Sequence, residues 1–191
     1  MTKKHLFILA LLCAIVQGAW AQNYDKWDGV TTSQPKCYMV KGERYRHVDI
    51  NSANEMAWVM KNFKPGNGFY YVSPYTRNTC WDNVYKVEYR LNVDVDMSAG
   101  NWTPIGSLFE EDDYKYHTPF RGNGHSIKFK IEGATKNYQG MFDKLKPGAE
   151  IKNLHLDANI HCTESRLVGG ICGENNVDIE NCKVSGTVKS D

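Results

Sequence analysis

Three charged residues near the middle of the chain have the types and spacing of a small catalytic set. Asp94 and Asp96 lie two positions apart in a stretch that predicts a strand, which would place their carboxylates about 7 Å apart on one face. Paired catalytic carboxylates have a similar separation, and Arg90 belongs to the same face. A polysaccharide lyase needs a cation beside such acids, but the polar outer face of a sheet is the simpler explanation.

A run of four acidic residues follows: Glu110, Glu111, Asp112 and Asp113. Their carboxylate oxygens could gather a hard cation such as calcium, although adjacent acids are also typical of a solvated loop. We expect no other metal or cofactor, because there is no C-x-x-C to support a zinc site. Motifs for a nucleophile elbow, a zinc protease or a phosphate loop are also absent from the sequence.

Aromatic residues are frequent in stretches with the composition of loops, and we single out Trp81, Tyr114 and Tyr116 as candidate binding residues. The apolar face of a sugar ring can stack on an exposed Trp or Tyr ring while its hydroxyls bind polar groups nearby. The alternative is that these rings cover the junction between an N-terminal helix and the first strands.

Residues 1–21 have the three parts of a secretory signal peptide. Lys3 and Lys4 form the basic start, an apolar run covers residues 6–16, and Ala19-Trp20-Ala21 has the small-x-small pattern of a cleavage site. The apolar run is too short for a membrane span, which takes about 20 residues. We therefore expect an exported protein, secreted or exposed at the cell surface.

The composition fits a soluble globular protein: 191 residues, 41% hydrophobic and 24% charged, with a formal net charge of +1. A net charge this small argues against a protein that binds nucleic acid through a basic surface. No second hydrophobic stretch follows the signal peptide, so we expect no membrane span.

Residues 22–83 form a polar N-terminal segment with one predicted helix. Ser52 and Glu55 have the spacing of a capping box, in which side chains satisfy backbone donors at a helix start. Apolar residues follow at helical spacing until Pro65 and Gly66 end the pattern. Because an amphipathic helix needs a surface to cover, we expect this segment to cap the strands of residues 84–191.

The strongest periodic pattern runs from Tyr85 to Met97, where seven apolar or aromatic residues alternate with six polar ones. Strict alternation predicts a sheet with one buried face. The run is long for one strand, so we expect a bend or bulge inside it.

The later strands look like copies of one another. Residues 151–160 align with residues 179–188 at an offset of 28, and residues 140–142 align with residues 170–172 at an offset of 30. Repeats of this length built from strands and turns predict the coils of a parallel β-solenoid. The expected fold is mainly β: a short parallel β-helix of about three coils with an N-terminal helical cap.

An earlier copy extends the repeat. It places Phe129 and Ile131 25 positions before Leu154 and Leu156. Stacked coils bring equivalent residues together, so we expect Asn153 to stack on the equivalent residue of the next coil. That contact is either an amide ladder between coils or a plain turn that contains asparagine.

Five cysteines remain behind the signal peptide, an odd number that cannot all pair within one chain. The repeat places Cys172 and Cys182 over apolar residues of the preceding coil, which predicts core positions. Cys37 and Cys80 then form the most plausible disulfide. Cys162 follows a histidine and could be an activated thiol, with a free or disulfide-bonded cysteine as the alternative.

The last predicted rung, residues 184–188, is followed by three residues only. An open strand edge invites pairing with another chain, and repeat proteins usually need a cap at each end. We therefore expect end-to-end self-association through this open C-terminal rung, unless the reading frame is shortened.

The order of several motifs resembles secreted β-helix proteins of gut Bacteroidetes-type bacteria that carry GLUG-type repeats. The matching stretches are residues 24–29, 52–59, 91–97, 102–106, 120–127 and the glycine-rich 168–175. The resemblance covers nearly the whole chain behind the signal peptide. It implies a right-handed β-helix, a secreted or surface location and an adhesive or glycan-related role, but it supplies no active site. The chain departs from the pattern by stopping after about three coils.

Two classes of function stay open. The first is a secreted or cell-surface module for adhesion, which binds an extracellular glycan or a host or bacterial surface protein. The second is a polysaccharide lyase or hydrolase on the same scaffold. About three coils offer little groove for a substrate, so we favour binding and expect no catalytic activity.

Overall fold

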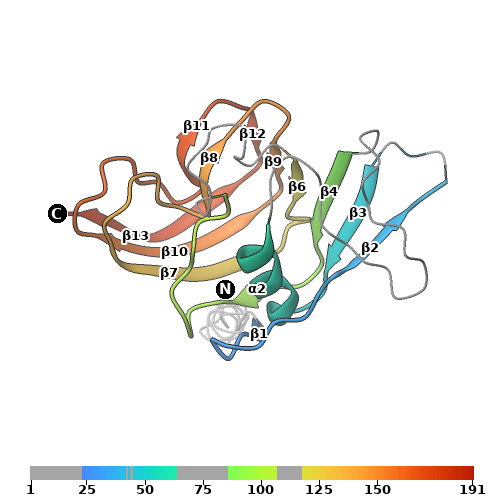
Figure 1. Ribbon diagram of the computed structural model, residues 1–191, viewed down its shortest axis with the longest axis horizontal. Coiled ribbons are helices and arrows are strands. Elements are labelled where there is room, and N and C mark those ends of the chain that lie inside the picture. The colour runs from blue at the N-terminus through green and yellow to red at the C-terminus, as the bar shows by residue number, and fades with distance from the viewer. Residues whose placement is uncertain (1–22, 42, 44, 64–85, 107–117) are drawn as a thin grey trace, which may run out of the picture.

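Strands are the main regular element of the described residues, and they gather in three sheets (Figure 1). The computed structural model describes residues 23–41, 43, 45–63, 86–106 and 118–191. Sheet A contains β1 (Asp25–Lys26), β5 (Val95–Asp96), β7 (Ser126–Ala134), β10 (His155–Cys162) and β13 (Lys183–Ser190). Sheet B contains β2 (Lys36–Met39), β3 (Tyr45–Ile50), β4 (Lys86–Leu91), β6 (Pro119–Arg121), β9 (Glu150–Lys152) and β12 (Ile179–Glu180). Sheet C contains β8 (Phe142–Leu145) and β11 (Cys172–Asn175).

The chain visits the three sheets in a fixed order, B then A then C. One turn contains β4, β5 and an isolated bridge at Ile105; the next contains β6, β7 and β8, and the third contains β9, β10 and β11. β12 and β13 repeat the first two steps. Each of these strands pairs in parallel with its equivalent in the next turn, and among the described strands β2 alone is antiparallel to its neighbour. The predicted β-solenoid of about three turns is therefore confirmed.

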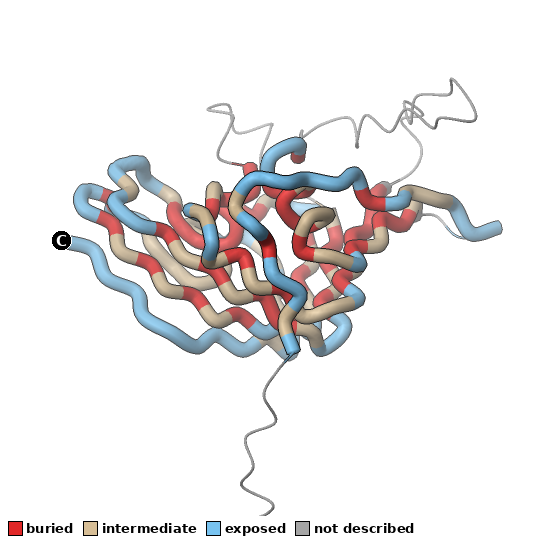
Figure 2. The backbone as a smooth tube through the Cα atoms, turned by 90° about the horizontal axis from the view of Figure 1, so that it is seen from below, coloured by how far each residue is buried: buried red, intermediate tan, exposed pale blue. Residues whose placement is uncertain are grey.

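Inward-pointing side chains form apolar columns that run through successive turns. In sheet A, Ile127, Leu156 and Val184 are register partners, and in sheet B, Phe120 pairs with Ile151. All of these except Val184 are buried, and in β10 the buried positions alternate with less buried ones along the strand (Figure 2). Because burying one such side chain contributes about 1.5–3 kcal/mol, the stacking of turns is the main source of stability.

The helix α2 (Ala53–Asn62) begins where the capping box predicts. Oγ of Ser52 accepts a hydrogen bond from the amide of Glu55 at 3.2 Å. A carboxylate oxygen of Asp25, in β1, accepts one from the amide of Ala53 at 2.6 Å. The start of the helix is thereby held against the first strand of sheet A.

α2 covers the N-terminal end of the solenoid. The helix follows β3, a strand of sheet B. In each later turn, the strand of sheet B is followed by a strand of sheet A instead. Met56, Val59 and Met60 are buried in the common core, and the amide of Thr103 contacts Sδ of Met60 at 3.4 Å. Within the described residues, no helix is long and apolar enough to cross a membrane.

Several predicted strands are in fact two strands that meet at a corner. The alternating run 85–97 contains β4 in sheet B and β5 in sheet A, so the expected bend lies between Leu91 and Val95. The alternation continues across the corner because Tyr89, in sheet B, and Val95, in sheet A, both point into the core. Sequence periodicity therefore could not locate the corner.

The repeat register is confirmed at two of its three predicted places. Ile151 pairs with Ile179 at the offset of 28, and Phe142 pairs with Cys172 at the offset of 30. The predicted alignment of Phe129 with Leu154 is wrong, because Phe129 pairs with Ala158, 29 positions later. Both alignments are compatible with an alternating strand, and shifting by four residues leaves every side chain on the same face.

Three cysteines lie at or beside the core. Cys172 and Cys182 pack against it half-buried, as predicted, and Cys162 is completely buried, which the sequence did not indicate. All three thiols are free. Cys37 lies in β2, whereas Cys80 lies outside the described residues, so the disulfide between them stays a prediction.

An asparagine occupies each corner where the chain leaves sheet B. The list is Asn51, Asn92, Asn123, Asn153 and Asn181. The last three have φ of 52°, 54° and 49°, a left-handed conformation that asparagine tolerates better than most residues. Nδ2 of Asn181 donates to Oδ1 of Asn153 at 2.6 Å, and similar amide bonds join Asn92 to Asn51 and Asn123 to Asn92. The predicted amide ladder is confirmed and extends to earlier turns.

The corner asparagines make a prediction that separates backbone conformation from hydrogen bonding. Asn153→Ala removes the polar side chain that makes the left-handed conformation tolerable and also removes the ladder amide, which together should lower the free energy of unfolding by about 2–3 kcal/mol. Asn153→Gly removes only the amide and should cost about 1 kcal/mol. Urea denaturation followed by circular dichroism measures both.

The matched control is Asn159→Ala in β10. Oδ1 of Asn159 accepts a hydrogen bond from Oγ1 of Thr187 at 2.9 Å, so this variant also loses an amide contact between turns, but at a residue without positive φ. It should resemble Asn153→Gly. Equal costs for Asn153→Ala and Asn153→Gly would show that the left-handed backbone does not select asparagine here.

Candidate functional site

Charged side chains on the outer face of sheet B form two neighbouring columns. In the cation column, Arg90, Arg121 and Lys152 are register partners in β4, β6 and β9. Glu88 and Glu150 stand beside them, two positions earlier in their strands. Neighbouring strands are about 4.8 Å apart, so ions of opposite sign come within reach of one another from turn to turn.

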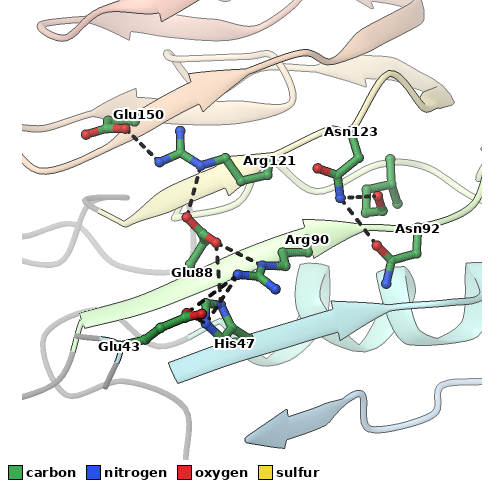
Figure 3. Close-up of polar contacts among 9 residues, drawn as sticks. Glu43, His47, Glu88, Arg90, Asn92, Arg121, Asn123 and Glu150 are labelled. Atoms are coloured by element: carbon green, nitrogen blue, oxygen red, sulfur yellow. Dashed lines mark hydrogen bonds and ion pairs between the residues drawn. The ribbon is translucent and has the colours of Figure 1, made fainter. Parts of the chain in front are cut away.

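We call this set the sheet B ion row, and most of it is drawn in Figure 3. Its members are charged or ionisable residues of five parallel strands and the loop before β3: Glu43, His47, Glu88, Arg90, Arg121, Glu150, Lys152 and Glu180.

Glu88 lies between the two arginines of the row (Figure 3). Its Oε1 accepts a hydrogen bond from Nε of Arg90 at 2.9 Å, and its Oε2 accepts one from Nε of Arg121 at 3.0 Å. Burial alone would raise the pKa of the Glu88 carboxyl, but the bonds from both guanidiniums hold that pKa below its ordinary value. Glu88 is therefore ionised at neutral pH and is a poor general acid.

His47 closes the row on the side of β3. Its Nε2 contacts the Glu43 carboxylate and lies 3.2 Å from Nη2 of Arg90, while its Nδ1 lies 3.4 Å from Oε1 of Glu88. The residue is 1% exposed. A histidine surrounded in this way connects β3 to β4 and does not reach a ligand outside.

Further ion pairs continue the row through the later turns. Nη2 of Arg121 donates to a carboxylate oxygen of Glu150 at 2.8 Å, and Nζ of Lys152 lies 3.1 Å from Oε1 of Glu180. The bond from Arg121 lowers the pKa of Glu150, and the bond to Glu180 raises the pKa of Lys152. Two buried nitrogens of the row, Nη1 of Arg121 and Nδ1 of His47, have no hydrogen-bond partner among the described residues.

The chemistry of the row is hydrogen bonding rather than proton transfer. Glu88 and Glu150 lie beside cations that favour their ionised form, and the histidine of the row is enclosed. Arg90, Lys152 and Glu150 are partly exposed, so they can bind polar groups of a partner laid across the turns.

The three residues of the predicted catalytic set, Arg90, Asp94 and Asp96, lie on two sheets and on the corner between them. Arg90 is in sheet B and bonds Glu88, Asp94 lies at the corner after β4, and Asp96 is in sheet A. Oδ1 of Asp94 accepts a hydrogen bond from the amide of Ser126 at 2.7 Å. Burial alone would raise the pKa of Asp96, but hydrogen bonds from Ser98 lower it. The corner separates side chains that a single straight strand would have kept on one face.

Other predicted site residues lie outside the described residues. They are the aromatic candidates Trp81, Tyr114 and Tyr116, and the acidic run Glu110, Glu111, Asp112 and Asp113. Among the residues that the structure describes, no three His, Cys, Asp or Glu side chains are grouped as a metal site would need. Calcium binding by the acidic run stays a prediction.

A repeat signal in the sequence could have found the ion row. Arg90, Arg121 and Lys152 follow one another at intervals of 31 residues, and each is the polar residue after an inward-pointing apolar one. The interval of 31 residues does not continue into the last turn, where Lys152 and its register partner Glu180 are 28 residues apart. A search for one constant repeat length therefore does not detect it.

The free thiols are poor nucleophiles. Burial raises the pKa of the thiols of Cys162, Cys172 and Cys182. In Cys172, burial and the nearby carboxylates of Asp143 and Glu174 together raise the pKa to about 11. An activated thiol would need the opposite shift.

Glu88→Gln tests the charge pairing in the ion row. Hydrogen bonds to charged groups contribute about 1.5–3 kcal/mol, so the variant should lose about 2 kcal/mol of stability at pH 7. The folded-state pKa of Glu88 is below its ordinary value of 4.5, so its stabilising effect is complete above pH 4.5 and is lost as the pH falls through the folded-state pKa. The difference from wild type should therefore shrink as the pH is lowered below 4.5, measured by urea unfolding at each pH.

Glu132→Gln is the matched control, because Glu132 is exposed in β7 and its carboxylate lies 3.7 Å from Nδ1 of the half-exposed His161. Its effect should be near the error of the measurement, as for most surface pairs. A Glu88→Gln defect of the same size at pH 3 and pH 7 would contradict the charge pairing.

Alkylation with iodoacetamide at pH 8, followed by peptide mapping, tests the thiols. A pKa of about 11 leaves Cys172 about a hundredfold less thiolate than an ordinary cysteine, and Cys162 is completely buried. Both should label slowly in the folded protein and rapidly in urea. Fast labelling of Cys162 in the folded protein would instead support an activated thiol.

The comparisons with known proteins agree with this geometry. A family model described as the GLUG motif matches residues 164–189. In the structure this range contains β11 and β12 and nearly all of β13, and so one step through each of the three sheets. No curated protein and no solved structure matches the chain. The chain carries a GLUG motif, and that motif is built into the last turn of the β-solenoid.

Proposed function

We propose that this chain is a secreted or cell-surface adhesion module that binds an extracellular glycan across the outer face of sheet B. Export is supported by the signal-peptide pattern of residues 1–21. The GLUG motif and the solenoid are compatible with such a module, and the resemblance to secreted GLUG-repeat proteins of Bacteroidetes-type bacteria points the same way.

The observation that carries the proposal is the cation column. Arg90, Arg121 and Lys152 occupy one position in three successive turns, so a polymer laid along the solenoid axis would meet a similar cation at each turn. Arginine and lysine donate hydrogen bonds to hydroxyl and carboxylate oxygens alike. A repeating donor on a rigid scaffold suits a repeating ligand.

Binding is favoured over a lyase or hydrolase reaction by the state of the same residues. A lyase base must reach a proton of the substrate, whereas His47 and Glu88 are buried among ions. The pKa values of Glu88 and Glu150 are lowered by the neighbouring cations, so these two carboxylates are not poised to donate a proton. What remains available to a partner is the partly exposed set of charged groups.

The test is retention of the purified protein on a panel of neutral and acidic polysaccharides. Lys152→Ala removes the most accessible cation of the column and should weaken binding about tenfold, the equivalent of one charge-assisted hydrogen bond. Lys128→Ala is the matched control: Lys128 lies in sheet A, is 37% exposed against 31% for Lys152, and also faces a carboxylate. It should bind as wild type does.

Each other outcome overturns part of the proposal. Equal losses in Lys152→Ala and Lys128→Ala would indicate diffuse charge attraction rather than a site on sheet B. Unsaturated products absorbing in the ultraviolet would indicate a lyase. If no polysaccharide retains the protein, a glycan is excluded as the partner and a surface protein is the remaining class of partner.

A further inference from the structure

The outer edge of β13 is the largest unpaired strand edge on the described part of sheet A. β13 is the last strand in the order β1-β5-β7-β10-β13 and pairs with β10 along all eight of its residues. Every residue of β13 is exposed, and the strand runs along the rim of the stack (Figure 2). The amide of Lys183 donates to the carbonyl of Leu154, just before β10, and the amide of Asp191 donates to that of Cys162 at the end of β10. Because amides alternate between the two edges of a parallel strand, those of Val184 and Val188 face outward.

The edge also exposes the ends of two apolar columns. Val184 stacks on Leu156, and Val188 stacks on Ile160. The two valines are 44% and 46% exposed, whereas the residues beneath them are 2% exposed. A strand that continued the stack would cover both valines and satisfy the outward amides.

The described residues at the opposite end of the solenoid do not form a matching edge. There, sheet A begins with the two residues of β1, and α2 covers the core. Head-to-tail stacking of copies would therefore place eight unpaired residues against two. Two copies that meet through the same end instead use one surface twice, as the two-fold symmetry of most dimers requires.

Two-fold pairing makes β13 antiparallel to its copy, and charge selects the register. Valines 184 and 188 point inward in both copies, so only registers that keep inward positions opposite each other are allowed. One such register sets Lys183 against Lys189, and like charges directly opposite are destabilising. The next sets Lys183 against Asp191 and Lys189 against Ser185, and it places Thr187 opposite its own copy on the axis.

We propose that two copies of this chain associate through antiparallel pairing of β13, about a two-fold axis at Thr187. In this register the outward amides belong to the residues flanking Thr187, so Thr187 and its copy form a pair without hydrogen bonds. The Cα atoms of such a pair are about 4.5 Å apart, within the range of a disulfide.

Light scattering of the purified protein at tens of micromolar tests the association, and the expected mass is twice that of the chain. Val188→Lys places an inward-pointing charge on the edge strand, which blocks pairing, and should give a monomer with an unchanged circular dichroism spectrum. Val30→Lys is the matched control, because Val30 is 78% exposed and lies in the N-terminal segment. It should remain a dimer.

Oxidative cross-linking tests the register and does not depend on how Val188→Lys folds. Thr187→Cys should form a disulfide between residues 187 of two copies, identified by peptide mapping so that the native cysteines do not confuse the result. Ser185→Cys should not link to its own copy, because four residues of strand, about 13 Å, separate the two positions in this register.

Three results would overturn the proposal. A wild-type monomer at this concentration excludes the association. A dimer that persists in Val188→Lys places the interface elsewhere, and cross-linking of Ser185→Cys that equals that of Thr187→Cys excludes the register.

Discussion

Each turn of this solenoid can bury its apolar side only against the turns next to it, and the rest of the structure depends on that constraint. Ile127, Leu156 and Val184 are equivalent residues, yet the first two are buried and the third is half-exposed, because nothing in the described chain lies beyond it. The same constraint explains why α2 lies where it does. A helix with one apolar side is the part of the chain that can close a stack without offering another strand edge.

The parallel stack also decides how polar residues are used. Equivalent positions recur one strand spacing apart, so a residue type that suits a position in one turn gains a partner of the same type in the next. At the corners this produces asparagines whose left-handed backbone turns the chain and whose amides bond between turns. On the outer face of sheet B it produces a column of cations, which is tolerable only because Glu88 and Glu150 stand beside it.

The sequence predicted the solenoid, the helix cap and the pairing of residues 151–160 with 179–188, because these turns have equal length and alternate cleanly. It failed where turn length changes. Phe129 was aligned four residues from its true partner, a shift that leaves its side chain on the same face and so leaves no trace in the pattern. Arg90, Asp94 and Asp96 were grouped for a related reason: both sheets face one core, so alternation passes through the corner between them unchanged. The ion row depends on contacts between residues about 31 positions apart, such as Glu88 with Arg121, which local periodicity does not detect.

Stability and binding are linked in a fold of this kind. Since each turn contacts only its neighbours, the free energy of the stack is close to a sum over adjacent pairs of turns. The ions of sheet B contribute to those same pairs: Arg121 joins β6 to β4 through Glu88 and to β9 through Glu150. A ligand that spans the cation column would add contacts to several pairs at once, and anything that binds the folded state alone stabilises it. A partner laid along the axis would thus act as one more element holding the turns together, which is a reason for an adhesive surface to follow the stacking direction rather than a single strand.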